Sequence, residues 1–224
     1  MFDTVLYVVF PYVALILAVL VGIYRYFYNR FTYPSLSSQF LENRELFWGS
    51  VPWHYGVILV LTAHLLALLF PGLWALLLGA QARLYVLELT GMALGLLAVI
   101  GLALLLLRRL SNPRITAVTS VMDWVLLADL LAQVVLGVWV ALVYRWGSAW
   151  YLQTAVPWLV SLAKFSPQVQ FVNALPLVVR LHFLNAFLLI ALFPFTRLVH
   201  LVTFPITYLW RPFQVVIWNR RPAR

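Results

Sequence analysis

The chain has 224 residues, of which 65% are hydrophobic and 9% are charged, and its mean hydropathy is +0.98. These values exclude a water-soluble domain of this length and indicate an integral membrane protein. The sequence contains no cysteine, which excludes iron–sulfur clusters, disulfides and thioether-linked haem in this chain. Membrane topology and anionic lipid headgroups explain the net charge of +9, so we expect no nucleic-acid partner.

Five apolar runs are each long enough to cross a hydrocarbon core, which takes about 20 residues of helix. In chain order they occupy residues 4–27, 52–71, 86–107, 120–143 and 176–202. The first run begins Met1-Phe2-Asp3 and carries bulky aromatic residues, which predicts a permanent helix and not a cleaved signal peptide. We predict one all-α membrane domain over residues 1–224, with five transmembrane helices and a basic tail over residues 203–224.

Positive charge is concentrated on one side of this predicted bundle. The segments after the first, third and fifth helices carry Arg25, Arg30, Arg44, Arg108, Arg109, Arg114, Arg211, Arg220, Arg221 and Arg224. The opposite side carries Arg83, Arg145 and Lys164. Because cytoplasmic loops are enriched in Lys and Arg, we predict an N-terminus outside and a C-terminus in the cytoplasm, in the cell's inner membrane.

All four histidines lie in or beside the apolar runs, two on the second predicted helix and two on the fifth: His54, His64, His182 and His200. At helical spacing, the first two are separated by about 15 Å and the last two by about 27 Å on one face. The chain direction pairs His54 with His200 on the inner side and His64 with His182 on the outer side. The two separations disagree by about 12 Å, and a kink at Pro194 would reduce the difference.

Two histidines on each of two helices, in complementary order, predict two haem irons with two axial imidazoles each, held between the second and fifth helices. Such irons have no open position for oxygen, which favours an electron carrier. Isolated membrane histidines also hydrogen-bond neighbouring helices, and a histidine-based proton or metal transporter is the alternative from a different functional class.

A few other polar or small residues stand out inside the helices. Asp129 and Gln133 lie one turn apart on the fourth helix, where we favour a hydrogen bond inside the bundle over a proton path. Gly91 and Gly95 form a small-xxx-small pair on the third helix, and Gly56 lies near His54, so helix packing is expected at these glycines.

Several motifs resemble one known family, the gamma subunit of respiratory nitrate reductase, a di-haem membrane cytochrome b. They are the histidine spacings on the second and fifth helices and the segments Arg180-Leu-His182, Phe193-Pro-Phe-Thr-Arg197-Leu-Val-His200, Arg108-Arg109-Leu-Ser-Asn-Pro113-Arg114 and Ser37-Ser38-Gln39. The resemblance covers almost the whole chain. It implies two haems b, with His54 and His200 at the inner haem and His64 and His182 at the outer haem.

The resemblance also implies a function. A quinol would be oxidised beside the outer haem, and menaquinol and ubiquinol both fit the sequence. Electrons would pass through both haems to an iron–sulfur beta subunit and then to a molybdenum alpha subunit that reduces nitrate. The closest rival is a related di-haem subunit of another quinone-linked oxidoreductase, one that handles sulfur compounds or heterodisulfides, because the terminal acceptor lies on another polypeptide.

The quinol site is where this sequence departs from the family. A lysine before the third helix helps to hold the quinol in such subunits, whereas this chain has Arg83 as the nearest cation. Candidate quinol-site residues are therefore His64, Arg83 and Glu88. Haem propionates seek cations at the membrane boundary, and the candidate partners are Arg109, Arg114 and Arg197 at the inner haem and Arg180 at the outer haem.

Overall fold

The computed structural model of the chain describes residues 2–29, 38–203 and 210. This part is helical, and five of its helices are long and apolar enough to cross a membrane: Phe2–Tyr28, Arg44–Leu69, Gln81–Ser111, Val121–Val143 and Leu177–Phe195. The prediction of five membrane-compatible helices is therefore confirmed. Arg30, Ser37 and all of the predicted basic tail from residue 204 except Trp210 lie outside the described residues.

The first span consists of α1 (Phe2–Thr4), a π-helical turn η1 (Val5–Val9) and α2 (Phe10–Tyr28). The second span is α3 (Arg44–Leu69), which begins eight residues before the predicted start at residue 52 and continues through Pro52. This early start has a local cause. The Glu42 carboxylate accepts hydrogen bonds from the backbone N–H groups of Glu45 (2.7 Å) and Leu46 (3.1 Å), which satisfies donors of the first turn.

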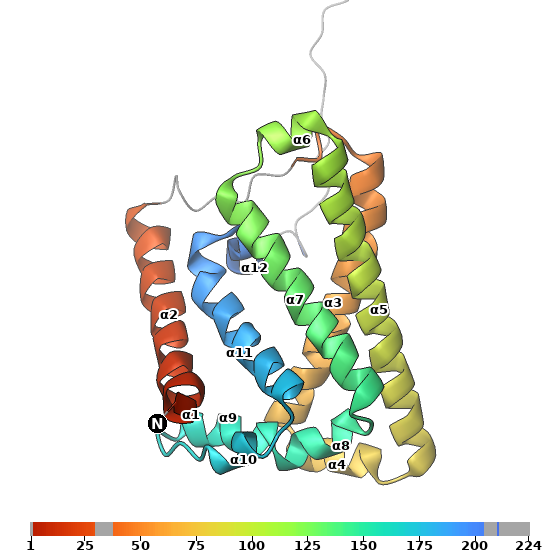
Figure 1. The fold of residues 1–224 in the computed structure, drawn as a ribbon, viewed down its shortest axis with the longest axis vertical. Coiled ribbons are helices and arrows are strands. Elements are labelled where there is room, and N and C mark those ends of the chain that lie inside the picture. The colour runs from red at the N-terminus through yellow and green to blue at the C-terminus, as the bar shows by residue number, and fades with distance from the viewer. Residues whose placement is uncertain (1, 30–37, 204–209, 211–224) are drawn as a thin grey trace, which may run out of the picture.

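The third and fourth spans are α5 (Gln81–Ser111) and α7 (Val121–Val143), and the fifth contains α11 (Leu177–Leu192). Short helices cover both ends of the bundle (Figure 1). One end, called the α8 end here, carries α4 (Pro71–Leu78), α8 (Gly147–Gln153), α9 (Ala155–Ala163) and α10 (Gln170–Asn173). The opposite end, called the α6 end, carries α6 (Pro113–Ala117) and α12 (His200–Thr203).

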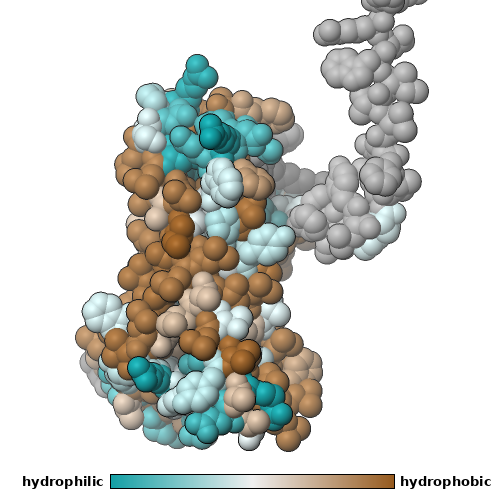
Figure 2. Space-filling model, turned by 90° about the vertical axis from the view of Figure 1, so that its right-hand side faces the viewer, coloured by the Kyte–Doolittle hydropathy of each residue, from teal (hydrophilic) through white to brown (hydrophobic). Residues whose placement is uncertain are grey.

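The long helices pack in the order α3, α5, α7, α11, α2, each against the next. The helices α3 and α11 share no comparably extensive interface in the described part of the chain. Figure 2 shows hydrophobic residues over the middle of one face and hydrophilic residues gathered towards its two ends. This distribution fits a bundle whose middle lies in lipid and whose ends lie in water.

Glycines let α3 and α5 approach closely. A Cβ atom built on Gly101 would lie 2.5 Å from the backbone nitrogen of Trp53 and 2.7 Å from the carbonyl oxygen of Gly49. One built on Gly56 would lie 2.7 Å from the carbonyl oxygen of Leu94. Small residues allow this backbone contact in membranes, where packing and not water drives association. Gly91 was also expected at a packing contact, but a Cβ atom built on it would have no other atom within 4 Å. The closest contact between α3 and α5 therefore lies elsewhere on α5.

The predicted fifth helix, residues 176–202, is interrupted. The α-helix ends at Leu192, and two 3₁₀ turns follow, η3 (Phe193–Phe195) and η4 (Arg197–Val199), before α12 begins at His200. Pro194 lacks the N–H that would continue the helix, and Thr196 between the turns is extended, with φ −119° and ψ 176°. The separation of about 27 Å between His182 and His200 was calculated for a continuous helix of about 18 residues. Because the helix is broken, this separation and the mismatch of about 12 Å that follows from it no longer apply.

Candidate functional site

Two histidines face each other near the α6 end. His54 comes from α3 and His200 from the start of α12, and their ring centroids are 6.1 Å apart with an angle of 69° between the ring planes. The Nδ1 of His54 lies 2.7 Å from the carbonyl oxygen of Ser50, and the Nδ1 of His200 lies 2.7 Å from that of Arg197. Because a carbonyl only accepts, each Nδ1 carries the proton and each Nε2 keeps a free lone pair.

The turn that presents His200 is held by side chains from other helices. Arg197 donates to both carboxylate oxygens of Asp123 on α7, at 2.6 and 2.9 Å. Asp123 itself closes a capping box with Ser120 at the start of α7. Arg25 of α2 donates to the carbonyl oxygen of Pro194. The end of the fifth span that carries His200 is therefore fixed by contacts with α7 and α2.

The second histidine pair lies towards the α8 end. His64 comes from α3, and its Nδ1 lies 2.8 Å from the carbonyl oxygen of Val60, so its Nε2 is also left free. His182, its predicted partner, comes from α11. The Nε2 of His182 lies 3.5 Å from the side-chain nitrogen of Gln133, and its buried Nδ1 has no hydrogen-bond partner among the described residues.

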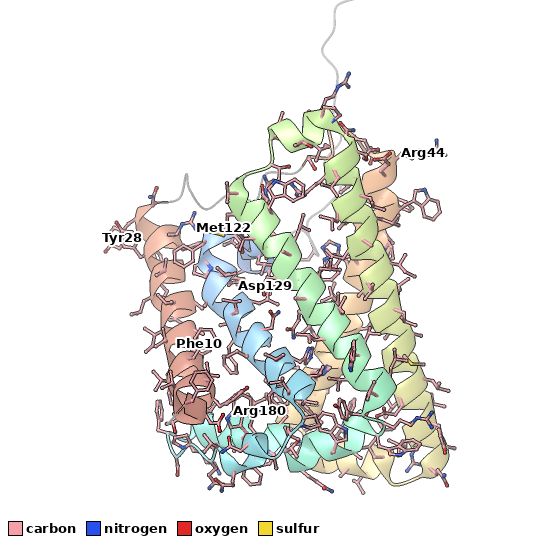
Figure 3. All side chains as sticks on the ribbon, in the orientation of Figure 1. Phe10, Tyr28, Arg44, Met122, Asp129 and Arg180 are labelled. Carbon is pink, nitrogen blue, oxygen red and sulfur yellow. The ribbon has the colours of Figure 1, made fainter. Side chains whose placement is uncertain are left out.

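Polar residues link His182 to the middle of α7. Asn185 donates to the side-chain oxygen of Gln133 at 3.0 Å and to the carbonyl oxygen of Asp129 at 3.1 Å. Figure 3 places Asp129 between α7 and α11. The expected hydrogen bonding inside the bundle is therefore present, but it reaches Asp129 through its backbone. The side-chain Oδ2 of Asp129 is buried without a partner in the described structure.

A glycine gives the ring of His182 its space. A Cβ atom built on Gly137 of α7 would lie 3.0 Å from Cε1 of His182, which is closer than an ordinary contact. No side chain larger than that of glycine fits there without moving the imidazole. This positioning residue was not predicted, because the sequence alone does not show which face of α7 meets α11.

Three of the four predicted propionate partners have partners within the protein. Arg109 donates to the hydroxyl of Thr119 at 2.8 Å, and Arg197 binds Asp123. Arg180, at the α8 end in Figure 3, donates to the carboxylate of Asp3 and lies 5.0 Å above the ring of Tyr7. The fourth is Arg114, whose backbone N–H donates to the side chain of Asn112. A role of these arginines towards propionates stays a prediction.

The sequence-based reasoning missed Arg108, which is 3% exposed. Its guanidinium binds the carboxylate of Glu42 at 2.6 Å and the hydroxyl of Ser38 at 3.0 Å. This arginine therefore joins the segment before α3 to the end of α5. Arg108 and Ser38 both belong to the motifs that resemble the family, but a basic residue at a helix end was assigned to the lipid boundary and the contact between the two motifs was not predicted.

Two of the three predicted quinol-site residues, Arg83 and Glu88, bind helix termini. Arg83 donates to the carbonyl oxygens of Leu77 (2.8 Å) and Leu76 (3.0 Å) at the end of α4. Glu88 accepts from the backbone N–H of Ser148 at 2.7 Å, in the first turn of α8. These contacts give each residue a structural function in positioning the short helices that cover this end of α3 and α5.

A tyrosine from α8 contacts the second histidine pair. The ring centroids of Tyr151 and His64 are 5.5 Å apart at an angle of 80°, and the tyrosine hydroxyl lies 3.5 Å from the carbonyl oxygen of His64. Burial raises the pKa of Tyr151 to about 12, so its hydroxyl keeps its proton at neutral pH. Among the described residues, no group of three or more His, Asp or Glu side chains is placed to hold a metal ion.

Comparison with known proteins gives one consistent family. A model of the nitrate reductase gamma subunit family matches residues 3–219. The nitrate reductase gamma chain of Bacillus subtilis is 31% identical over 225 residues, which cover 99% of this chain and 100% of that protein. The respiratory nitrate reductase 2 gamma chain of Escherichia coli is 31% identical over 213 residues, 94% of each chain.

A longer relative contains the same segment. The nitrate reductase-like protein NarX of Mycobacterium tuberculosis is 31% identical over 226 residues, which cover 99% of this chain and 34% of that protein. The family match spans all five membrane-compatible helices and both histidine pairs. The chain therefore belongs to the nitrate reductase gamma subunit family, whose members are membrane-anchor subunits of an oxidoreductase complex.

Proposed function

We propose that the chain binds two haems b, each between two histidines, and carries electrons from a quinol towards the nitrate-reducing part of the complex. The observation that carries this proposal is the 6.1 Å separation of the His54 and His200 rings. Imidazole nitrogens lie about 2 Å from the metal that they bind, so two imidazoles that hold one metal ion between them would have ring centroids about 6 Å apart. The two residues meet this requirement from separate helices.

The protonation of the histidines fits the same use. Three of them, His54, His64 and His200, donate Nδ1–H to a backbone carbonyl and leave Nε2 free for a metal. Such hydrogen bonds orient an imidazole ligand and increase its basicity. A haem held by these histidines would supply a reversible one-electron carrier.

Charge supports the proposed orientation. The arginines on the described segments that begin or end towards the α6 end are Arg25, Arg44, Arg108, Arg109, Arg114 and Arg197. The segments towards the α8 end carry Arg83, Arg145, Lys164 and Arg180. We place the α6 end in the cytoplasm because cytoplasmic loops are enriched in Lys and Arg. His54 and His200 then form the inner site, and His64 and His182 form the outer site, in the inner membrane of the cell.

The direction of electron flow follows from this orientation. A quinol would be oxidised at the outer site and release its two protons to the outside, and the haems held by the two histidine pairs would supply the path for its two electrons. An iron–sulfur beta subunit at the cytoplasmic side would accept these electrons for a molybdenum alpha subunit. The names of the relatives, gamma chains of nitrate reductases, support nitrate as the terminal acceptor over sulfur compounds or heterodisulfides.

Single histidine substitutions test the pairing. His54→Ala and His200→Ala remove the same b-type signal from a reduced-minus-oxidised spectrum, and His64→Ala and His182→Ala remove the other. Tyr55→Phe is the control, since Tyr55 is 65% exposed next to His54 and keeps both signals. The absence of b-type bands from the wild-type protein would refute the haem assignment. The pairing would be refuted if His54→Ala and His200→Ala, or His64→Ala and His182→Ala, removed different b-type signals.

A further inference from the structure

The short helix α8 is fixed to α5 at its first turn. Trp146, which precedes α8, adopts a left-handed backbone with φ 67° and ψ 34°, and its ring centroid lies 4.9 Å from that of Tyr85 on α5. The N–H of the next-but-one residue, Ser148, donates to Glu88, also on α5. A helix held at these points presents its side chains in defined positions over the outer site.

Tyr151 is the residue that α8 places against this site. Its half-buried ring packs edge-on to the imidazole of His64, with centroids 5.5 Å apart. Its hydroxyl lies 3.5 Å from the backbone carbonyl oxygen of His64, at the long limit of a hydrogen bond. Little free energy is lost when so long a bond is exchanged for a better one.

The chemistry of a neutral phenol suits both forms of a quinone. A phenol hydroxyl accepts a hydrogen bond from the hydroxyl of a quinol, and it donates one to the carbonyl of the oxidised quinone. A carboxylate such as Glu88 only accepts, and a guanidinium such as Arg83 only donates. Both of those side chains already bind helix termini.

We propose that Tyr151 binds the head group of the quinol through its hydroxyl, beside His64. This proposal rests on the function proposed above and assigns a polar contact to the quinol beside His64, where Arg83 and Glu88 both bind helix termini. The head group lies next to the tyrosine ring, and the hydroxyl turns from the His64 carbonyl to the ligand oxygen. Oxidation of the quinol releases two electrons to the haems and two protons to the outside water, and Tyr151 is neither oxidised nor deprotonated.

The test is Tyr151→Phe in the complete membrane complex, with menadiol as the reductant. This substitution keeps the ring against His64 and removes the hydroxyl alone. Loss of one ligand hydrogen bond raises the KM for menadiol by about 5–20-fold, while kcat changes less than about twofold. Calorimetric titration of the oxidised complex with menadione shows a similar weakening of binding. Both b-type signals keep their wild-type amplitude.

Tyr85→Phe is the matched control, because it removes a hydroxyl at the same end of the molecule and leaves the ring beside Trp146. Its KM for menadiol stays at the wild-type value. An unchanged KM in Tyr151→Phe would overturn the inference, and loss of the outer haem from that variant would do so as well, since it would assign the tyrosine a structural role. Wild-type complex that lacks b haem or does not oxidise menadiol would instead refute the proposed function.

Discussion

Replacing Gly101 by alanine forces α3 and α5 apart next to the inner histidine. The new Cβ atom would lie 2.5 Å from the nitrogen and 2.9 Å from the Cα of Trp53, the residue before His54. Non-bonded carbon atoms are stable at about 3.5–4.0 Å, so the helices must separate by about 1 Å. Overpacking of this kind costs about 1–3 kcal/mol in stability, which is a factor of roughly 5–150 in an equilibrium constant.

The displacement also acts on the inner site. Ligand distances around a metal tolerate a change of about 0.2 Å, so a shift of α3 by about 1 Å takes His54 out of reach of an iron that His200 still binds. We expect Gly101→Ala to lose the inner b-type signal and keep the outer one. Spectra of the purified complex, followed through a redox titration, measure both signals, and thermal unfolding measures the loss of stability.

Gly91→Ala is the control on the same helix, because a Cβ atom at this position has no neighbour within 4 Å. It gains the higher helix propensity of alanine, worth about 1 kcal/mol at most, and keeps both haems. Equal stability and equal haem content in Gly101→Ala and Gly91→Ala would refute the idea that the close approach of α3 and α5 positions His54.

Three further substitutions probe other contacts. Gly137→Ala places a Cβ atom 3.0 Å from Cε1 of His182, so the outer b-type signal shifts or weakens while the inner one stays unchanged in the same spectra. Arg197→Gln removes an ion pair whose arginine is 31% exposed, which costs about 1–3 kcal/mol, less than a fully buried pair, and loosens His200, so inner-haem occupancy falls. Burial raises the pKa of Glu42, but hydrogen bonds from its buried arginine partner and from backbone N–H groups outweigh this and hold the pKa below its usual range. The ionised Glu42 carboxylate therefore stabilises the fold fully at pH values above the usual pKa of a glutamate, and this stabilisation is lost as the pH falls through the lowered pKa of Glu42. We expect the melting temperature of the wild-type protein to fall on acidification and that of Glu42→Gln to fall less.

Sequence patterns predicted the number of spans because apolar length alone decides whether a helix can cross lipid. The facing of His54 and His200 followed from chain direction and topology, which need no atomic detail. The close approach of α3 and α5 was predicted in part. Gly56 was expected to serve helix packing and lies at the contact with α5, whereas Gly91 has no neighbour within 4 Å. The contact between Gly49 and Gly101 was not predicted, because it joins two helices and no spacing within one helix indicates it.

The break after Leu192 was indicated only in part. Pro194 predicted a bend, but the second turn depends on Arg197 reaching Asp123, which is 74 residues away in sequence. Tyr151 escaped prediction for a similar reason. It lies on a seven-residue helix whose position over His64 is set by Glu88 of another helix, so its function depends on tertiary contacts.

Because the fifth span is interrupted, the four proposed histidine ligands differ in how firmly the backbone holds them. His54, His64 and His182 lie within long helices, where displacement of the backbone that carries the side chain requires disruption of several backbone hydrogen bonds. His200 is exposed and follows a single turn of 3₁₀ helix. Segments of this kind open locally at a lower free energy than the helices around them. If the chain binds haem as proposed, we expect His200 to exchange as a ligand faster than the other three histidines, at a rate limited by the Arg197–Asp123 and Arg25–Pro194 contacts that hold its turn.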